Sequence, residues 1–162
     1  NQANPAFHHD TTAVEILHQM QGRVDAVVVG VGTGGTFSGL ARFMKETQPR
    51  THCVAVETEG SVLQGGKPGS HKVEGIGSSF VPETFHRDVC DEIIMVSDKD
   101  AFATVAQLAR LEGVLGGSSA GANVFAALQV AKKLGKGKRV VTVIPDSAER
   151  YLSKDIFCGG TE

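Results

Sequence analysis

The sequence contains no tryptophan, one tyrosine and only three cysteines among its 162 residues. The cysteines, Cys53, Cys90 and Cys158, are odd in number and widely spaced. This spacing argues against a disulfide framework or a zinc knuckle and favours reduced thiols in a cytoplasmic protein. No apolar run is long enough to cross a bilayer, and a net charge of −2 gives no basis for a nucleic-acid or membrane partner.

Glycine, in contrast, is abundant. The chain has 20 glycines, well above the usual share of about 7%. They cluster in residues 30–39, 60–77 and 113–121, which is typical of functional turns rather than of one linker. The length fits a single α/β unit over residues 1–162. Because the chain starts at Asn1 without a methionine or a signal-peptide pattern, we expect a fragment or a processed piece.

Apolar periodicity predicts an alternation of helices and strands. A continuous valine-rich run is typical of a strand covered on both faces, and a parallel α/β sheet with flanking helices follows from the alternation. Thr12 with Glu15 is interpreted as a capping box. The long glycine-rich segment 60–82 has no period and is expected to be a functional or mobile loop. Predicted strands are 24–31, 52–57, 92–96 and 139–144, and predicted helices are 12–20, 36–47 and 98–112. A last helix is predicted to open in the turn 116–121 and to run to about residue 134.

The most informative stretch runs from a buried strand through Gly30-Val-Gly-Thr-Gly-Gly35 into a helix. Glycines let the backbone approach a ligand closely, and free amides at the helix start attract an anion. The glycine-rich turn has three possible interpretations. In the first, it binds a single terminal phosphate, for which Thr33 and Thr36 are suitable hydroxyl donors. Glu57, at the end of the next strand, is placed as in a nicotinamide dinucleotide site, NAD or NADP. The glycines could also serve only tight packing.

Other motifs carry both a structural and a functional interpretation. In the turn Gly116-Gly-Ser-Ser-Ala-Gly121, Ser118 or Ser119 is either a helix N-cap or a ligand contact. Residues 75–77 form either a plain turn or a backbone wall against a flat ring. His8 and His9 precede a predicted helix without metal-ligand spacing, so surface or capping roles, and no metal site, are expected.

Taken together, the motifs resemble the second half of the cysteine synthase and cystathionine β-synthase family, which are fold type II pyridoxal phosphate enzymes. The resemblance covers nearly the whole chain, in order and with similar spacing. It rests on Asn4-Pro5, His8, Thr11-Thr12, Glu15-Ile16, Gly32-Thr-Gly-Gly-Thr36, Ser61-Val-Leu, Gly65-Gly-Lys-Pro-Gly69, His71-Lys-Val-Glu-Gly-Ile-Gly77, Glu112-Gly113, the turn 117–121 and Pro145-Asp-Ser-Ala-Glu-Arg-Tyr-Leu152.

The resemblance implies roles for individual residues in binding pyridoxal 5'-phosphate. Ser119 would bond the pyridine nitrogen of the cofactor, and Pro145 and Asp146 would lie near that end of the ring. Gly75, Ile76 and Gly77 would line the active-site loop. The cofactor phosphate would be held by Gly32, Thr33, Gly34, Gly35 and Thr36.

The resemblance also implies what this chain lacks. The family's Schiff-base lysine and its substrate-carboxylate loop lie in the first half, upstream of Asn1, so no catalytic residue is assigned here. We expect the chain to be cut from a longer one, to be a piece of a nicked protein, or to pair with a separate N-terminal piece, and to be inactive alone. The complete enzyme, expected to be a homodimer, would make cysteine or cystathionine from serine or an O-acylserine and sulfide or a thiol.

The motifs do not choose between sulfide and homocysteine. Glu74 and Ser119-Ala-Gly121 are more similar to cystathionine β-synthase, whereas residues 146–152 are more similar to cysteine synthase. A dinucleotide oxidoreductase domain remains the first alternative, and a non-catalytic half-enzyme that binds pyridoxal phosphate remains the second.

Overall fold

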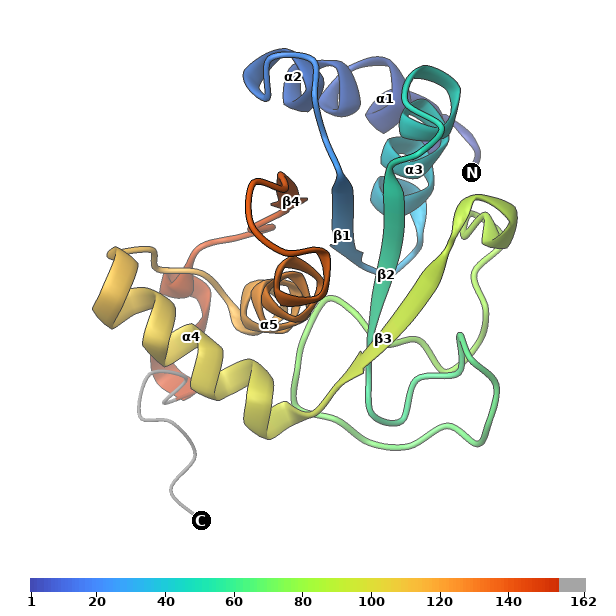
Figure 1. Ribbon diagram of the computed structural model, residues 1–162. Coiled ribbons are helices and arrows are strands. Elements are labelled where there is room, and N and C mark those ends of the chain that lie inside the picture. Colours follow the sequence, from blue (N-terminus) through green and yellow to red (C-terminus); the bar gives the residue numbers. More distant parts are fainter. Residues whose placement is uncertain (155–162) are drawn as a thin grey trace.

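The computed structural model describes residues 1–154 and has a parallel sheet at its centre (Figure 1). In this part of the chain the strands are β1 (Ala26–Gly30), β2 (His52–Thr58), β3 (Glu92–Val96) and β4 (Val140–Thr142). Their order is β3-β2-β1-β4, and all neighbouring pairs are parallel. This confirms the predicted α/β class with a parallel sheet. β4 is shorter than predicted, because the chain leaves the sheet after Thr142.

The valine-rich run forms the central strand because it is buried on both faces. Val27 and Val29 of β1 belong to one apolar cluster, whereas Ala26 and Val28 belong to another. Successive side chains of a strand point to opposite faces, so β1 supplies both cores. Cys53 of β2 is fully buried in the first cluster, as predicted for a core residue.

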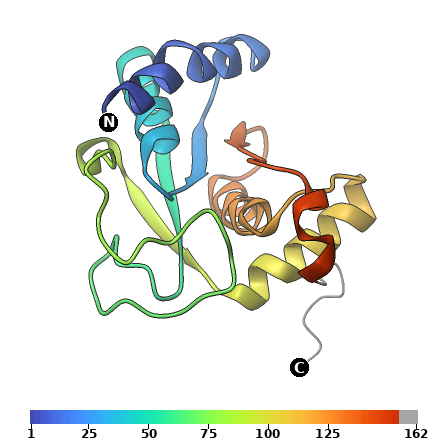
Figure 2. The same cartoon turned by 180° about the vertical axis from the view of Figure 1, so that it is seen from behind.

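Helices cover the two faces unequally (Figure 2). α1 (Ala3–Asp10), α2 (Thr12–Gln19) and α3 (Gly35–Thr47) lie on one side of the sheet. α5 (Ser118–Leu134) lies on the other side, and α4 (Asp98–Glu112) packs against α5. Short 3-10 helices, η1 (Arg87–Val89) and η2 (Ala148–Lys154), complete the described elements. No described helix is both long and apolar enough to cross a membrane.

The end of α2 and both ends of α4 agree with the sequence prediction. Ser97 caps α4 by accepting a hydrogen bond of 3.1 Å from the Asp100 amide. Gly22, after α2, and Gly113, after α4, have positive φ angles of 73° and 68°, as glycines that end helices commonly do.

The start of the chain differs from the prediction. α1 was not predicted, although its proline, Pro5, lies in the first turn, where proline is tolerated. The predicted capping box is wrong, because Thr11 occupies the N-cap of α2 without a side-chain cap bond. Thr12 is instead the first residue of α2, and its hydroxyl bonds His8 in α1 at 2.9 Å.

The predicted long loop is confirmed, since residues 59–86 contain no helix or strand. It returns to the carboxyl end of the sheet, where the Gly77 amide donates to the Val31 carbonyl at 3.1 Å. The loop therefore carries the glycines of its second half to the turn between β1 and α3 (Figure 1).

Candidate functional site

The turn between β1 and α3 forms a cradle of free amides. Gly34 is the N-cap of α3 with φ +92°, and no side chain caps the helix. The first amides of a helix have no acceptor within it, and the helix dipole favours an anion there. A Cβ on Gly34 would lie only 2.7 Å from the Phe85 amide nitrogen, so glycine is required both for the φ angle and for the space.

The carbonyls of this turn are held away from the cradle. The Ser78 hydroxyl donates to the Gly32 carbonyl at 2.9 Å, and the Thr84 hydroxyl donates to the Thr33 carbonyl. Since the N–H and C=O of a trans peptide point in opposite directions, the amides that follow these carbonyls point away from the 78–84 segment. The long loop therefore fixes the direction in which the amides of the cradle point.

One hydroxyl of the cradle joins a short hydrogen-bond chain through His8. Thr36 Oγ1 lies 3.1 Å from His8 Nε2, and His8 Nδ1 lies 2.9 Å from Thr12 Oγ1. Burial lowers the pKa of His8, so its ring is neutral at pH 7 and has one donor and one acceptor nitrogen. The expectation of a surface or capping role for His8 is wrong, because His8 lines the cavity described below. That role depends on α1, which was not predicted.

The start of α5 contributes another part of the site. Its N-cap is Gly117, without a side-chain cap bond, so neither serine of the turn is the cap that the sequence offered as an alternative. Ser118 instead accepts a hydrogen bond of 2.9 Å from the Glu74 amide. Ser119 is only 3% exposed and makes no side-chain hydrogen bond to any described residue. The Ser119 hydroxyl therefore has no protein partner among the described residues, and Ser119 lines the cavity described below.

The Gly75 turn lies next to Ser119 in the lining of the cavity. Gly75 has φ +84°, and a Cβ placed on it would lie 3.9 Å from Ser119 Oγ. His71 holds this turn, because its ring nitrogens lie 2.8 Å from the Val73 carbonyl and 3.1 Å from the Gly77 carbonyl. The backbone of residues 75 and 76 therefore forms a wall without a side chain at Gly75.

Asp146 and Tyr151 close the cavity near the end of the described chain. The Tyr151 hydroxyl donates to Asp146 Oδ2 at 2.6 Å. This hydrogen bond, followed by burial and by the nearby carboxylate charges, raises the pKa of Tyr151 to about 12. Tyr151 is therefore neutral at pH 7 and orients the Asp146 carboxylate.

These walls enclose a cavity of about 530 Å³ at the carboxyl ends of β1 and β4, which we call the carboxyl-edge cavity. In open parallel sheets, ligands bind at this edge. All but one of the residues predicted for the cofactor line it: Gly32, Thr33, Gly34, Gly35, Thr36, Gly75, Ile76, Ser119, Pro145 and Asp146. The exception, Gly77, lines a neighbouring hollow of about 470 Å³ together with Gly32 and Gly75.

Several further residues line the cavity although their sequence context predicted no such role: His8, Thr12, Asn123, Arg150 and Tyr151. For one of them a signal was available. Asn123 follows Ser119 by four residues, so both lie on the same face of α5. Its side-chain nitrogen donates to the Val143 carbonyl at 2.8 Å, which ties α5 to the chain after β4.

Glu57 has a structural role. Its side chain is fully buried, and its carboxylate accepts hydrogen bonds from the Leu63 amide at 3.0 Å and from the Gln64 side chain at 2.8 Å. Both bonds order the start of the long loop. Glu57 is therefore not offered to a ligand, which removes the acidic residue on which the dinucleotide interpretation depended.

Comparison with known proteins identifies one matching family and several similar enzymes. A family described as pyridoxal-phosphate dependent enzyme matches residues 1–146. The chain is 47% identical over 159 residues to a cysteine synthase from Staphylococcus aureus (strain N315), covering 97% of the chain and 51% of that protein. It is 46% identical over 160 residues to an O-acetylserine dependent cystathionine beta-synthase from Bacillus subtilis (strain 168), covering 99% of the chain and 52% of that protein.

A solved structure agrees with these sequence matches. The crystal structure of an O-acetylserine dependent cystathionine beta-synthase from Helicobacter pylori superposes with a TM-score of 0.93 at 44% identity, covering 97% of this chain and 51% of that one. The chain thus spans about half the length of the relatives that it matches.

Proposed function

Because the chain belongs to the family of pyridoxal-phosphate dependent enzymes, we propose that the carboxyl-edge cavity binds pyridoxal phosphate for β-replacement chemistry. The phosphate would be held by the amides and hydroxyls of residues 32–36. Ser119 would contact the pyridine nitrogen, and Gly75 and Ile76 would border the ring, with Gly77 beside them. Pro145 and Asp146 would lie near the pyridine end.

The observation that carries this proposal is that one cavity is lined both by the uncapped start of α3 and by a serine hydroxyl without a protein partner among the described residues. The α3 cradle has no side-chain cap, and Ser119, only 3% exposed, has no side-chain partner among the described residues. A ligand with a phosphate at one end and a neutral ring heteroatom at the other would satisfy both. The cavity volume of about 530 Å³ suits a small cofactor.

The choice of a serine at that position has a chemical consequence. A hydroxyl is neutral, so it does not hold a proton on a ring nitrogen as a carboxylate would. When bound, pyridoxal phosphate supplies the electron sink for α-proton loss, and a neutral partner makes that sink weaker. This favours proton loss coupled to departure of a β-substituent over transamination. No described lysine lines the cavity, so the residue that bonds the cofactor would come from outside this chain.

The complete protein would therefore convert serine or an O-acylserine, together with sulfide or a thiol, into cysteine or cystathionine. Its relatives carry both names at nearly equal identity, 47% and 46%, and so do not select the acceptor. We also propose that this chain works with an N-terminal lysine-bearing part, as a homodimer in the cytoplasm.

Binding is tested first, without turnover. Phosphorus NMR of pyridoxal phosphate mixed with the chain should show a broadened, shifted resonance, and NAD should not displace the cofactor. Thr36→Val should weaken binding through the phosphate, whereas Thr47→Val, on the same helix but far from the cradle, should leave it unchanged. Displacement by NAD would exclude this proposal and revive the dinucleotide alternative.

Turnover is tested by supplying the missing part. The chain is combined with the portion of the Bacillus subtilis relative that it does not cover, and O-acetylserine is offered with sulfide or homocysteine. Formation of cysteine or cystathionine is expected. If this assembly binds pyridoxal phosphate but forms neither product, the chain is a non-catalytic cofactor-binding half.

A further inference from the structure

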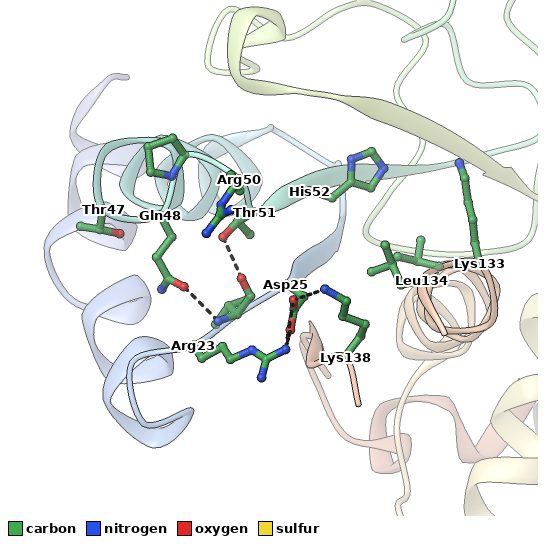
Figure 3. A pocket seen from close by; sticks show the side chains of 13 residues that line it. Arg23, Asp25, Thr47, Gln48, Arg50, Thr51, His52, Lys133, Leu134 and Lys138 are labelled. Carbon is green, nitrogen blue, oxygen red and sulfur yellow. Dashed lines mark hydrogen bonds and ion pairs between the residues drawn. The ribbon is translucent and has the colours of Figure 1, made fainter. Parts of the chain in front are cut away.

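A second hollow lies at the opposite edge of the sheet, at the amino ends of the strands (Figure 3). It measures about 840 Å³ and shares no lining residue with the carboxyl-edge cavity. We call it the amino-edge hollow. It is bordered by the residues that precede β1, the turn between α3 and β2, the last turns of α5, and Lys138.

The charges of this hollow are strongly unequal. Its lining has four cationic side chains and a single carboxylate: Arg23, Arg50, Lys133 and Lys138 against Asp25. Lys133 is paired outside the hollow with Glu92 at 3.1 Å. Even after this pairing, the remaining cations outnumber Asp25.

Asp25 acts as an anchor that arranges two of these cations. Its carboxylate lies 2.9 Å from Lys138 Nζ and 3.2 Å from the Arg23 guanidinium, and it accepts a hydrogen bond of 3.0 Å from the Arg139 amide. Arg23 also donates to the Gly137 carbonyl at 3.3 Å. Figure 3 shows Arg23 and Lys138 reaching Asp25 from different elements. Both side chains are therefore already ordered, which lowers the entropy that a ligand must remove.

Unused hydrogen-bond donors remain after these contacts. A guanidinium has five N–H groups and an ammonium has three, so Arg23 and Lys138 retain several. Arg50 makes no hydrogen bond or ion pair with any described residue. In the floor of the hollow, Gln48 accepts from the Val24 amide at 3.1 Å, whereas its own side-chain nitrogen is buried without a described partner.

We propose that the amino-edge hollow binds a small polyanion that carries at least two phosphate or carboxylate groups. Arg23 and Lys138 form the ordered half of the site, and Arg50 is the unpaired cation that closes on the ligand. An anion rich in oxygen acceptors matches this surplus of donors, since hydrogen bonds between charged groups are the strong ones. The site is separate from the proposed cofactor site, and its occupation does not depend on that proposal.

The test uses inorganic pyrophosphate as the probe and amide NMR of the labelled chain at low ionic strength. We expect amide shifts in residues 23–25, 48–52 and 137–139, unchanged when pyridoxal phosphate is present in excess. Shifts confined to residues 32–36 would mean that pyrophosphate occupies only the cradle, and an absence of shifts would mean no site; either result would overturn the proposal.

Variants separate a built site from general surface charge. Arg50→Ala removes no hydrogen bond or ion pair between described residues, so we expect the fold to be kept and the affinity for pyrophosphate to fall by about tenfold or more. Lys138→Ala should have a similar effect. Lys136→Ala is the matched control, because it removes the same charge from the same loop at an exposed residue that does not line the hollow; it should change affinity by less than about threefold. Equal losses for Lys136→Ala and Lys138→Ala would contradict the proposal.

Discussion

The carboxyl and amino edges of the sheet offer different kinds of hydrogen-bond donor to an anion. At the carboxyl edge, the cradle of residues 32–36 offers backbone amides and hydroxyls, and Arg150 is the only cationic side chain among the described residues that line the cavity. At the amino edge, the lining has four cationic side chains and one carboxylate. Backbone amides present one fixed geometry, whereas cationic side chains recognise negative charge on many kinds of oxygen acceptor. The first edge therefore suits a precisely placed cofactor, and the second suits a range of polyanions.

The largest effect that tests this contrast comes from a methyl group in the cradle. In Gly32→Ala the new Cβ would overlap the Gly75 carbonyl oxygen, and a backbone neighbour cannot move aside. We expect a loss of about 3 kcal/mol of unfolding free energy and loss of pyridoxal phosphate binding, measured by chemical denaturation and phosphorus NMR. Gly66→Ala is the control, since it has φ +104° but open space around it, and it should cost about 1 kcal/mol. Equal costs would mean that the cradle is not tightly built.

The next largest effect separates two neighbouring serines. Ser118→Ala removes the acceptor of the Glu74 amide and should lower the unfolding free energy by about 1 kcal/mol. Ser119→Ala removes no described hydrogen bond and should change it by less than about 0.5 kcal/mol, yet weaken cofactor binding. Denaturation and cofactor titration of both variants provide the measurements. A destabilised Ser119→Ala protein with normal cofactor affinity would assign Ser119 a purely structural role.

At the amino edge, the corresponding test is the pH dependence of the unfolding free energy. The Arg139 amide, followed by Lys138 and Arg23, lowers the pKa of Asp25 from 3.8 to about 2. Since the unfolded chain binds this proton more readily, the contribution of Asp25 to stability is complete above about pH 4 and is lost as the pH falls toward 2. The stability difference between the wild type and Asp25→Asn should therefore shrink over this range in urea denaturation. A constant difference would show that the Asp25 cluster is not ionically coupled.

The smallest effect is spectroscopic and belongs to the carboxyl edge. The chain has one tyrosine and no tryptophan, so absorbance near 295 nm reports the ionisation of Tyr151 alone. We expect this ionisation near pH 12 and at lower pH in Asp146→Asn, because the hydrogen-bonding carboxylate is gone. Ionisation at the ordinary value near 10 in the wild type would mean that Tyr151 does not orient Asp146.

Much of the fold followed from local patterns. The β3 strand at 92–96 and the Ser97 cap were predicted at their observed residues, because strand alternation and caps depend on near neighbours in the sequence. α1 was not predicted, since an opening with Asn-Pro gives weak periodicity and the helix is held mainly by packing against α3.

The candidate site likewise has parts that were predicted from local sequence and parts that only the structure revealed. The glycine cradle was predicted from one continuous segment. The positive φ angle of Gly34 is a local requirement, whereas the close approach of Phe85 is a tertiary one. Glu57 was open to a ligand role because its spacing fits one, and only the path of the long loop shows that the Leu63 amide and the Gln64 side chain use its carboxylate. His8 joined the site for a similar reason, through a contact with Thr36 that spans 28 residues.

By itself, the sequence determined the alternation of strands and helices, the amide cradle after β1 and the resemblance to one enzyme family, because each is recorded in short segments or in their order along the chain. The tertiary structure alone decided that Ser119 is not a cap, that Gly75 lies next to it and that Arg23 and Lys138 share Asp25. The contacts of Gly75 with Ser119 and of Asp25 with Lys138 join residues far apart in the chain, so the packing of separate segments decides them rather than a local preference.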